Sequence, residues 1–189
     1  MTKRIISNPL FRPGPNQLLN ACVADNGGPY DFGAYGEGFF EGGFQIVNSI
    51  KRGEWHIDIL IDPATFCFRH GIELYLKHLI HMLAKINLAD NYKPTHDIAD
   101  NFDFFNKFTK SKPGLIDEIQ LATSKKLIEY FIMVDETGQV FRYPEDRKGN
   151  QHLAGISVIN IEVLEKGMKE LHSILEDWRN LVEELVNPS

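Results

Sequence analysis

The sequence predicts a mainly α-helical bundle, with a small hairpin-like or extended insertion before the last helix. Apolar side chains recur at helical spacing along most of residues 31–186. Capping residues stand in front of several of these periodic segments. A hydrophobic fraction of 43% with thirteen Phe is enough for one core, and a chain near this size buries roughly 70% of its unfolded surface.

The chain is predicted to divide into an irregular arm and one domain. Residues 1–28 are rich in Pro, Asn and Gly, and a short helix is expected over 17–23. The domain comprises 29–189 and begins with a helix over about 31–52 that contains five glycines. Each glycine costs up to ~1 kcal/mol against Ala, so we interpret them as points of close packing against a neighbour. The period-two alternation of apolar residues over 55–61 predicts a short strand.

The central helix is predicted to run from Asp62 to Ile86. Asp62 is a good N-cap, and Pro63 suits the first position of a helix. At about 100° per residue, large apolar side chains fall on one side of this helix. The other side carries polar residues: Arg69, His70, Glu73, Lys77 and His81.

Three further helices are predicted at residues 95–108, 115–133 and 161–186. Thr95 and Asn160 are the expected N-caps of the first and the third. Residues 139–143 and 155–159 look extended, and an exposed loop is expected between them. These segments form the expected insertion before the last helix.

The helix over 161–186 carries a heptad seam of large apolar residues. Their spacings alternate between four and three: Leu164, Met168, Leu171, Leu175, Trp178, Val182 and Leu185. Such a seam packs against one long partner helix, in the same bundle or in another subunit. The pattern supports both equally, and we expect a homodimer or a hetero-complex that uses this helix.

Composition limits the classes of partner. The net charge of −6 argues against a general binder of duplex nucleic acid, which normally shows a basic face. Any contact with RNA is therefore expected to be local, at a cavity or across a dimer interface. No apolar run approaches the ~20 residues of a membrane span, and no apolar segment of a signal peptide follows the basic residues near the N-terminus. We expect a cytoplasmic protein with no membrane association.

The sequence indicates neither a metal site nor a cofactor. The seven His are scattered, and the spacings of zinc-binding Cys and His motifs do not occur. His78 and His81 stand three residues apart, but no third ligand is identifiable from the sequence. The glycines over 33–38 do not have the spacing of a phosphate-binding loop.

The first candidate for chemistry is the cluster Arg69, His70, Glu73 and Lys77. One interpretation is an exposed, salt-bridged face of an amphipathic helix, since Glu73 and Lys77 have the favourable i,i+4 orientation. The other is a site for phosphodiester cleavage. There His70 would transfer a proton, and Arg69 would stabilise the negative charge that develops at phosphorus.

Further candidates lie outside the central helix. Arg142 stands between two aromatic residues and is expected to point inward to a carboxylate, for which Glu73 is a candidate. His96 is expected to open a helix, where its side chain has access to a cleft. Arg147 and His152 are separated by four residues in a polar loop. They are either a catalytic pair or ordinary loop residues.

One block of the central helix resembles a signature of bacterial HEPN-like helical proteins. The block is Arg69-His70-x-x-Glu-Leu-x-Leu-Lys77. Two further pieces fit in the same order, His96-Asp-Ile at the start of the next helix and Phe-Arg142-Tyr-Pro after a turn. The resemblance covers about residues 30–155.

The resemblance implies a helical bundle, often dimeric, with relatives that act as metal-independent RNases in toxin–antitoxin and anti-phage systems. The catalytic motif of those relatives is an Arg, four to six intervening residues and a His. Arg147 and His152 have this spacing here, whereas Arg69 is followed directly by His70.

We therefore expect a metal-independent endoribonuclease, or an RNase-derived effector, of a prokaryotic defence or toxin system. In this hypothesis Arg69 contacts the phosphate, His70 is the acid or base, and Glu73 orients His70. Arg142 and His96 complete the pocket. The alternative is a non-catalytic helical interaction module, such as an antitoxin or a complex subunit.

Overall fold

The computed structural model describes residues 9–23, 30–86 and 93–187, which belong to two compact units, Met1–Tyr30 and Asp31–Ser189. The described residues of the first unit are exposed and contain one short 3-10 helix, η1, Gln17–Leu19. The side chain of Asn16 accepts a hydrogen bond from the backbone N–H of Leu18 at the start of η1 (3.1 Å). The helix in this segment is shorter than the sequence predicted.

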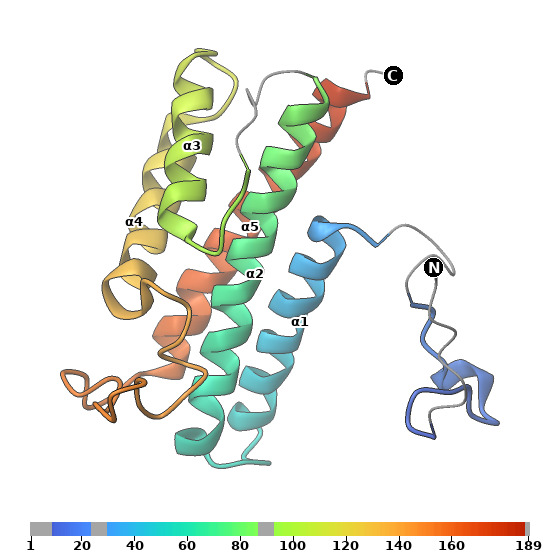
Figure 1. The fold of residues 1–189 in the computed structure, drawn as a ribbon, viewed down its shortest axis with the longest axis vertical. Helices are drawn as coiled ribbons and strands as arrows, with labels where there is room; N and C mark the ends of the chain where they lie inside the picture. The colour runs from blue at the N-terminus through green and yellow to red at the C-terminus, as the bar shows by residue number, and fades with distance from the viewer. Residues whose placement is uncertain (1–8, 24–29, 87–92, 188–189) are drawn as a thin grey trace. The chain divides into compact units, whose positions relative to one another are not determined.

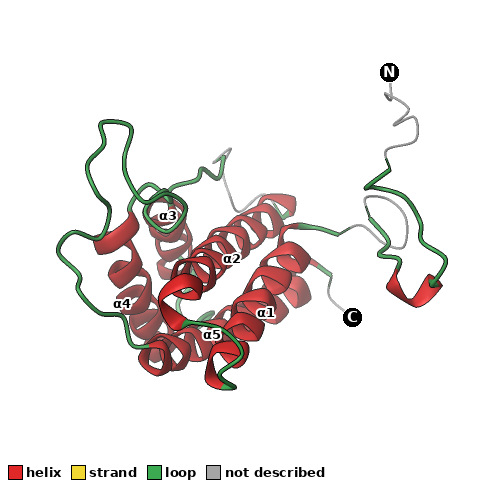
Figure 2. Ribbon diagram, turned by 90° about the horizontal axis from the view of Figure 1, so that it is seen from below, coloured by secondary structure: helices red, strands yellow, loops and turns green. Residues whose placement is uncertain are grey.

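The second unit is a bundle of α-helices, and the prediction of a mainly helical bundle is confirmed (Figure 1). In the described residues the helices are α1 Phe32–Lys51, α2 Ile57–Lys85, α3 Ile98–Lys110, α4 Glu118–Asp135 and α5 Ile161–Val186. The long helix α2 packs against α1, α3 and α5, and α4 packs against α3 and α5. Figure 2 shows helices and loops and no strand in the part of the chain that is described. None of these helices combines the length and hydrophobicity needed to cross a membrane.

The pairing of α1 with α2 depends on glycines, as the sequence predicted. A Cβ at Gly36 or Gly43 would lie 2.8 or 2.7 Å from an aromatic ring of α2. These two positions therefore admit no larger residue unless a ring of α2 moves. The interpretation is wrong for Gly38 and Gly42, where a Cβ would meet no atom within 4 Å.

The beginning of α2 differs from the prediction. The helix begins at Ile57 rather than after Asp62, so the strand predicted over 55–61 is wrong and Pro63 lies inside the helix. Ile59 is largely exposed, so the alternating isoleucines do not form the buried face of a strand. No strand lies beside this segment in the described chain, and a helix satisfies the backbone hydrogen bonds without a neighbour.

The other boundaries follow the capping side chains. Asp97, not Thr95, caps α3, and its Oδ1 accepts hydrogen bonds from the backbone N–H groups of Ala99 (2.7 Å) and Asp100 (3.3 Å). Asp117 caps α4, which begins later than predicted. The helix predicted over 161–186 and its Asn160 cap are confirmed.

Residues 136–160 connect α4 to α5 without a regular strand in this described segment. The extended conformation predicted over 139–143 is wrong, because the backbone turns there and the N–H of Arg142 donates to the carbonyl of Gln139 (3.1 Å). Residues 156–159, within the second segment predicted to be extended, are irregular. One isolated antiparallel bridge joins Glu145 and Gln151.

The heptad seam of α5 lies in the core of its own bundle. The buried residues of the seam are Met168, Leu171, Leu175, Trp178 and Val182. The Trp178 ring lies 5.0 Å from the ring of Phe105 in α3, and α5 packs on α1, α2 and α4. The seam therefore forms an intramolecular interface, and a contact with another subunit would use a different face of α5.

Candidate functional site

A stripe of charged residues runs along one face of α2 and is buried. Arg69, Glu73 and Lys77 follow each other at intervals of four residues and are 2%, 3% and 9% exposed. The interpretation of this stripe as an exposed salt-bridged face is therefore wrong. The segment that begins α3 and the loop after α4 contact the stripe, through His96 and Gly138.

The carboxylate of Glu73 is the centre of the stripe. Its Oε2 accepts a hydrogen bond from Nη1 of Arg69, and its Oε1 accepts one from Nζ of Lys77, both at 2.8 Å. Nδ1 of His96 lies 2.9 Å from Oε1, and Nδ1 of His70 lies 3.7 Å from Oε2. Four nitrogen-bearing side chains thus surround one buried carboxylate.

These contacts determine the protonation state of Glu73. Burial alone would raise the pKa of the Glu73 carboxyl, because a low-dielectric environment disfavours the charged form. Contacts with His70 and Lys77, the positive charge of Lys77 and the contact with His96 outweigh burial, and lower the pKa from 4.5 to about 2. Glu73 is therefore ionised at neutral pH despite its burial.

Arg69 is held by three segments of the chain. In addition to Glu73, its Nη2 donates to the backbone carbonyl of His96 (3.2 Å), and its Nε lies 4.0 Å from Oδ2 of Asp135. The backbone of Gly138 lies so close that a Cβ there would be 3.1 Å from Cζ of Arg69. The guanidinium group thus joins α2 to the start of α3 and to the loop after α4.

Asp135 shapes that loop. It is the last residue of α4 and is fully buried, and its Oδ1 accepts hydrogen bonds from the backbone N–H groups of Gln139 (2.8 Å) and Val140 (3.0 Å). Gly138 has φ of +74°, a conformation that L side chains rarely adopt. Together these features turn the backbone over Arg69 and explain why 139–143 is not extended.

The stripe and the loop enclose a cavity of about 430 Å³ that opens to solvent. Five of the candidate site residues line it: Arg69, His70, Glu73, His96 and Arg142. The remaining lining comes from Phe66 and from residues 137–139. The structure thus brings together side chains from α2, from the segment before α3 and from the loop after α4.

Three of the lining side chains are accessible. The His96 side chain is 87% exposed and that of His70 is 30% exposed. The His70 ring stacks on Phe66, with centroids 5.7 Å apart, and packs edge-on against Phe39 at 4.5 Å. The Arg142 guanidinium also lies over the Phe66 ring, at 5.6 Å from its centroid. Phe66 therefore holds both His70 and Arg142 at the cavity.

The predicted ion pair between Arg142 and Glu73 does not form. Arg69 and Lys77 already occupy the two oxygens of the Glu73 carboxylate. Arg142 is exposed and makes no ion pair with any residue that the structure describes. Its positive charge is therefore available to a ligand in the cavity.

Arg147 and His152 line a second, larger cavity rather than the first. Its volume is about 780 Å³, and Lys148 also contributes to it. Both cavities share Thr137 and Gln139 as lining residues, so they are adjacent. The structure does not place Arg147 or His152 in the cavity around Glu73.

The sequence did not identify all residues that build the first cavity. Asp135 and Gly138 belong to the turn before Phe-Arg142-Tyr-Pro, and neither they nor Phe66 were expected to contribute to a site. The only sequence signal was an Asp near the end of a predicted helix followed three residues later by Gly, which is a combination typical of turns. Its effect on Arg69 could not be inferred, because the two segments are far apart in sequence.

Comparisons with protein-family models, with curated proteins and with solved structures find no match to this chain. What the cavity can do follows from its own residues. Two accessible imidazoles can act as acid or base, the ionised Glu73 can orient them, and Arg142 can stabilise an anion. This set of groups suits proton transfer at a substrate that carries or develops negative charge.

Replacing Glu73 with Gln is expected to destabilise the fold by about 3–5 kcal/mol at pH 7, because Arg69 and Lys77 stay buried without their carboxylate. The folded-state pKa of Glu73 is lower than its ordinary value of 4.5. The stabilisation by ionised Glu73 is therefore present above about pH 4.5 and lost as the pH falls towards 2. Urea unfolding at several pH values between 2 and 7 measures both effects.

The matched control is Glu129→Gln, which removes the acid of an exposed Lys125–Glu129 pair at the same i,i+4 spacing. Exposed pairs contribute little, so this variant should behave as the parent protein does across the pH range. A Glu73→Gln variant as stable as the parent at pH 7 would show that burial of Arg69 and Lys77 does not depend on the Glu73 carboxylate.

Replacing Gly138 with Ala is expected to destabilise the protein more than replacing Gly149 with Ala. Both glycines have positive φ, +74° and +81°, so each Ala pays a left-handed backbone cost of about 1–2 kcal/mol. Only at Gly138 does the new Cβ also press on Arg69, since Gly149 faces open space. Thermal or urea unfolding measures the loss of stability in each variant, and the difference between the two losses reports the contact with Arg69. Equal losses of stability would show that the loop does not pack tightly against Arg69.

Proposed function

We propose that this chain is a HEPN-like, metal-independent endoribonuclease, or an RNase-derived effector, of a prokaryotic defence or toxin system. The observation that carries the proposal is the meeting of His70, His96 and Arg142 around ionised Glu73 in one open cavity. All four residues come from the sequence pieces that resemble HEPN-like proteins, and His70 and Glu73 belong to the most specific piece. The cavity thus gathers the residues that carry the resemblance.

The proposed reaction is attack of an RNA 2′-hydroxyl on the adjacent phosphorus. A base takes the proton of the 2′-hydroxyl, and an acid gives a proton to the departing 5′-oxygen. His70 and His96 are the two groups that can share these roles. Nδ1 of each imidazole faces Glu73, which leaves Nε2 of each ring for the substrate. Glu73 orients both rings.

Arg142 takes the electrostatic role in this proposal. It is exposed at the cavity, whereas Arg69 is 2% exposed and bonded to Glu73 and to the carbonyl of His96. We therefore assign phosphate binding to Arg142 and treat Arg69 as a positioning residue. In the adjacent cavity, Arg147 and His152 would contact flanking phosphates of the same RNA. Such local basic groups allow RNA to bind a chain with net charge −6.

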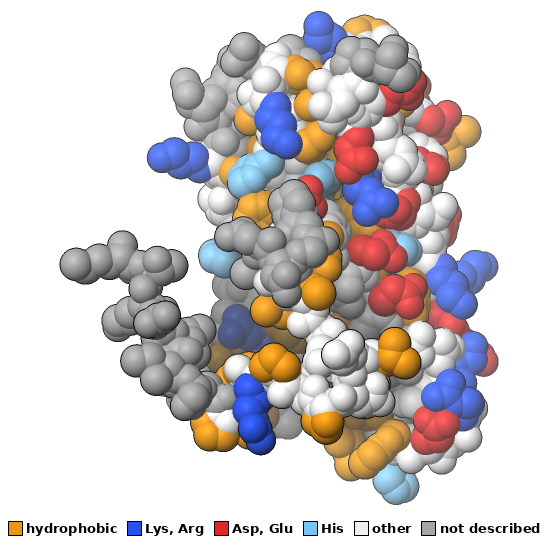
Figure 3. Space-filling view, turned by 90° about the vertical axis from the view of Figure 1, so that its right-hand side faces the viewer, with side chains coloured by type: hydrophobic (Ala, Val, Ile, Leu, Met, Phe, Trp, Pro, Cys, Tyr) orange, Lys and Arg blue, Asp and Glu red, His pale blue; other side chains and the backbone are white. Residues whose placement is uncertain are grey.

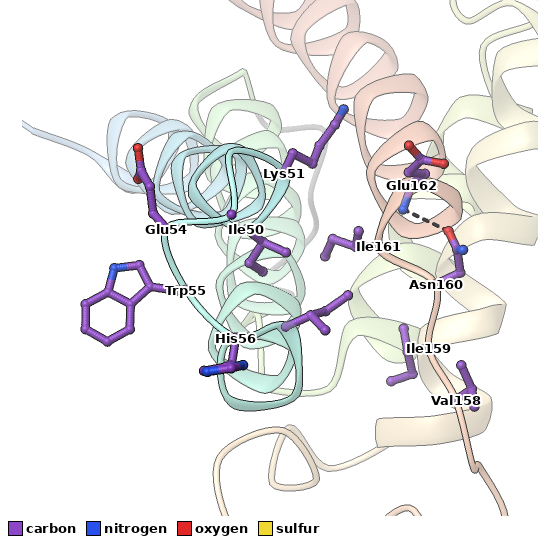
Figure 4. Close-up of a pocket in the computed structure, with 12 residues that line it drawn as sticks. Ile50, Lys51, Glu54, Trp55, His56, Val158, Ile159, Asn160, Ile161 and Glu162 are labelled. Atoms are coloured by element: carbon purple, nitrogen blue, oxygen red, sulfur yellow. Dashed lines mark hydrogen bonds between the residues drawn. The ribbon is translucent and has the colours of Figure 1, made fainter.

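A second function, a helical interaction module, is favoured by a hollow at the start of α5 that is lined by both apolar and polar side chains. The volume of this cavity is about 820 Å³. Figure 4 shows Trp55 and His56 from the α1–α2 turn and Val158 and Ile159 from the segment before α5 among its lining residues. Trp55 and Val158 are largely exposed. A homodimer or hetero-complex through the C-terminal helix would bury these side chains.

The test of the proposed function is cleavage of single-stranded RNA by the purified protein in EDTA. His70→Ala and His96→Ala should each lower the rate by about 10²–10⁴-fold, as expected for loss of a general acid or base. Both residues lie at the cavity rim, so circular dichroism spectra should match that of the parent. His56→Ala, an exposed His outside this cavity, should leave the rate unchanged.

Other outcomes assign the function differently. Catalysis would lie in the second cavity if His70→Ala and His96→Ala were both fully active. In that case Arg147→Ala or His152→Ala should be inactive. If the parent protein cleaves no RNA in EDTA, the nuclease proposal is wrong and the interaction module replaces it.

A further inference from the structure

A second polar cluster lies on the opposite face of α2 from the cavity. Tyr75 follows Glu73 by two residues, which is about 200° around a helix, and its side chain faces α1 and α5. Tyr75 is fully buried, and its hydroxyl contacts Glu37 of α1 and Glu176 of α5. His172, one turn before Glu176, completes the cluster.

The four side chains are in direct contact. The Tyr75 hydroxyl donates to Oε2 of Glu37 (2.5 Å) and also contacts Oε1 of Glu176. Nε2 of His172 lies 2.8 Å from the same Glu37 oxygen and 3.3 Å from the Tyr75 hydroxyl. One potential ligand atom from each of Glu37, His172 and Glu176 lies within 4.8 Å of the other two.

Two carboxylates share one hydroxyl proton in this cluster. The Tyr75 hydroxyl has one proton but contacts two carboxylates. Arg179 pairs with Oε2 of Glu176 at 2.8 Å, which leaves Oε1 directed to the cluster. The two carboxylates thus converge on one hydroxyl proton and the imidazole of His172, while Arg179 pairs with the other oxygen of Glu176.

We propose that Glu37, His172 and Glu176 bind one zinc ion. An imidazole with two carboxylates is a ligand set that zinc accepts, and a site with three protein ligands leaves the fourth position to water. At Zn–ligand distances of about 2.0–2.2 Å the ligand atoms are about 3–4 Å apart, so small rotations of the three side chains are sufficient. The ion would lie between the two carboxylates, and Tyr75 remains a donor to a ligating carboxylate.

The surroundings suit a metal site. His172 and Glu176 are four residues apart and share one face of α5, and the His172 ring is fixed by stacking on Phe40, at 4.6 Å between centroids. Each of the three ligands is half-buried, so an ion can enter from solvent. Figure 3 shows acidic side chains gathered on one face of the molecule, among Lys, Arg and His. The ion would join α1 to α5 and plays no part in the proposed RNA cleavage.

The test uses the full chain, stripped with EDTA, dialysed and titrated with zinc chloride in a calorimeter, with the melting temperature measured in parallel. One zinc ion should bind per chain and raise the melting temperature, because an ion that binds only the folded state stabilises it. Glu37→Gln, His172→Ala and Glu176→Gln should each weaken zinc binding by more than about 100-fold. Loss of a residue that only hydrogen-bonds to a metal ligand weakens binding by less than this.

The matched controls are Glu170→Gln on the exposed side of α5 and His56→Ala, which should bind zinc as the parent does. Cys22→Ser should also retain binding, since it removes the exposed thiol. Tyr75→Phe separates the roles within the cluster. It removes the proton between the carboxylates but no ligand, so the variant should still bind zinc. Zinc should raise its melting temperature by at least as much as it raises that of the parent.

Two results would overturn the proposal. The first is a parent protein that binds no zinc, or that loses binding in the Cys22→Ser variant. The second is a set of ligand variants that fold, as judged by circular dichroism, and bind zinc as tightly as the parent.

Discussion

The ion pairs of Glu73 with Arg69 and Lys77 are the interaction on which the candidate site depends. Isolated on α2, the three side chains would form an ordinary solvated stripe, but here they are buried. Burial of two cations is tolerated because the carboxylate between them is ionised. The same carboxylate contacts His96, while Arg69 contacts Gly138, so the network joins three distant segments. Removing the charge of Glu73 would affect the fold and the cavity together.

The sequence predicted helices best where periodicity and capping agree. The Asn160 cap and the seam of α5 gave its boundaries, because both signals are local. The start of α2 was mispredicted, because alternating isoleucines are compatible with a strand only if another strand pairs with them, and a single segment does not reveal its neighbours. Residues 139–143 were mispredicted for a related reason. The side chain of Asp135 accepts hydrogen bonds from two backbone N–H groups there, and the chain turns.

The candidate site could be predicted only in part. The spacing of Arg69, Glu73 and Lys77 placed them on one face of a helix, but their burial depends on a loop more than sixty residues away. The contact of Tyr75 with Glu37, His172 and Glu176 gave no sequence signal at all, since these residues come from three helices. One helix thus carries two polar networks on opposite faces: an open one with accessible imidazoles, and a more enclosed one between α1 and α5.

The dependence of the site on ionised Glu73 is tested most directly by measuring the pKa of Glu73 in the folded protein. Its side-chain carboxyl carbon can be followed by NMR through a pH titration of ¹³C-labelled protein, with Glu73→Gln used to assign the signal. We expect a pKa of about 2 for Glu73, well below the ordinary 4.5, because the two imidazoles and Lys77 stabilise the charged form. A pKa at or above 4.5 would contradict this expectation, since burial would then outweigh those contacts.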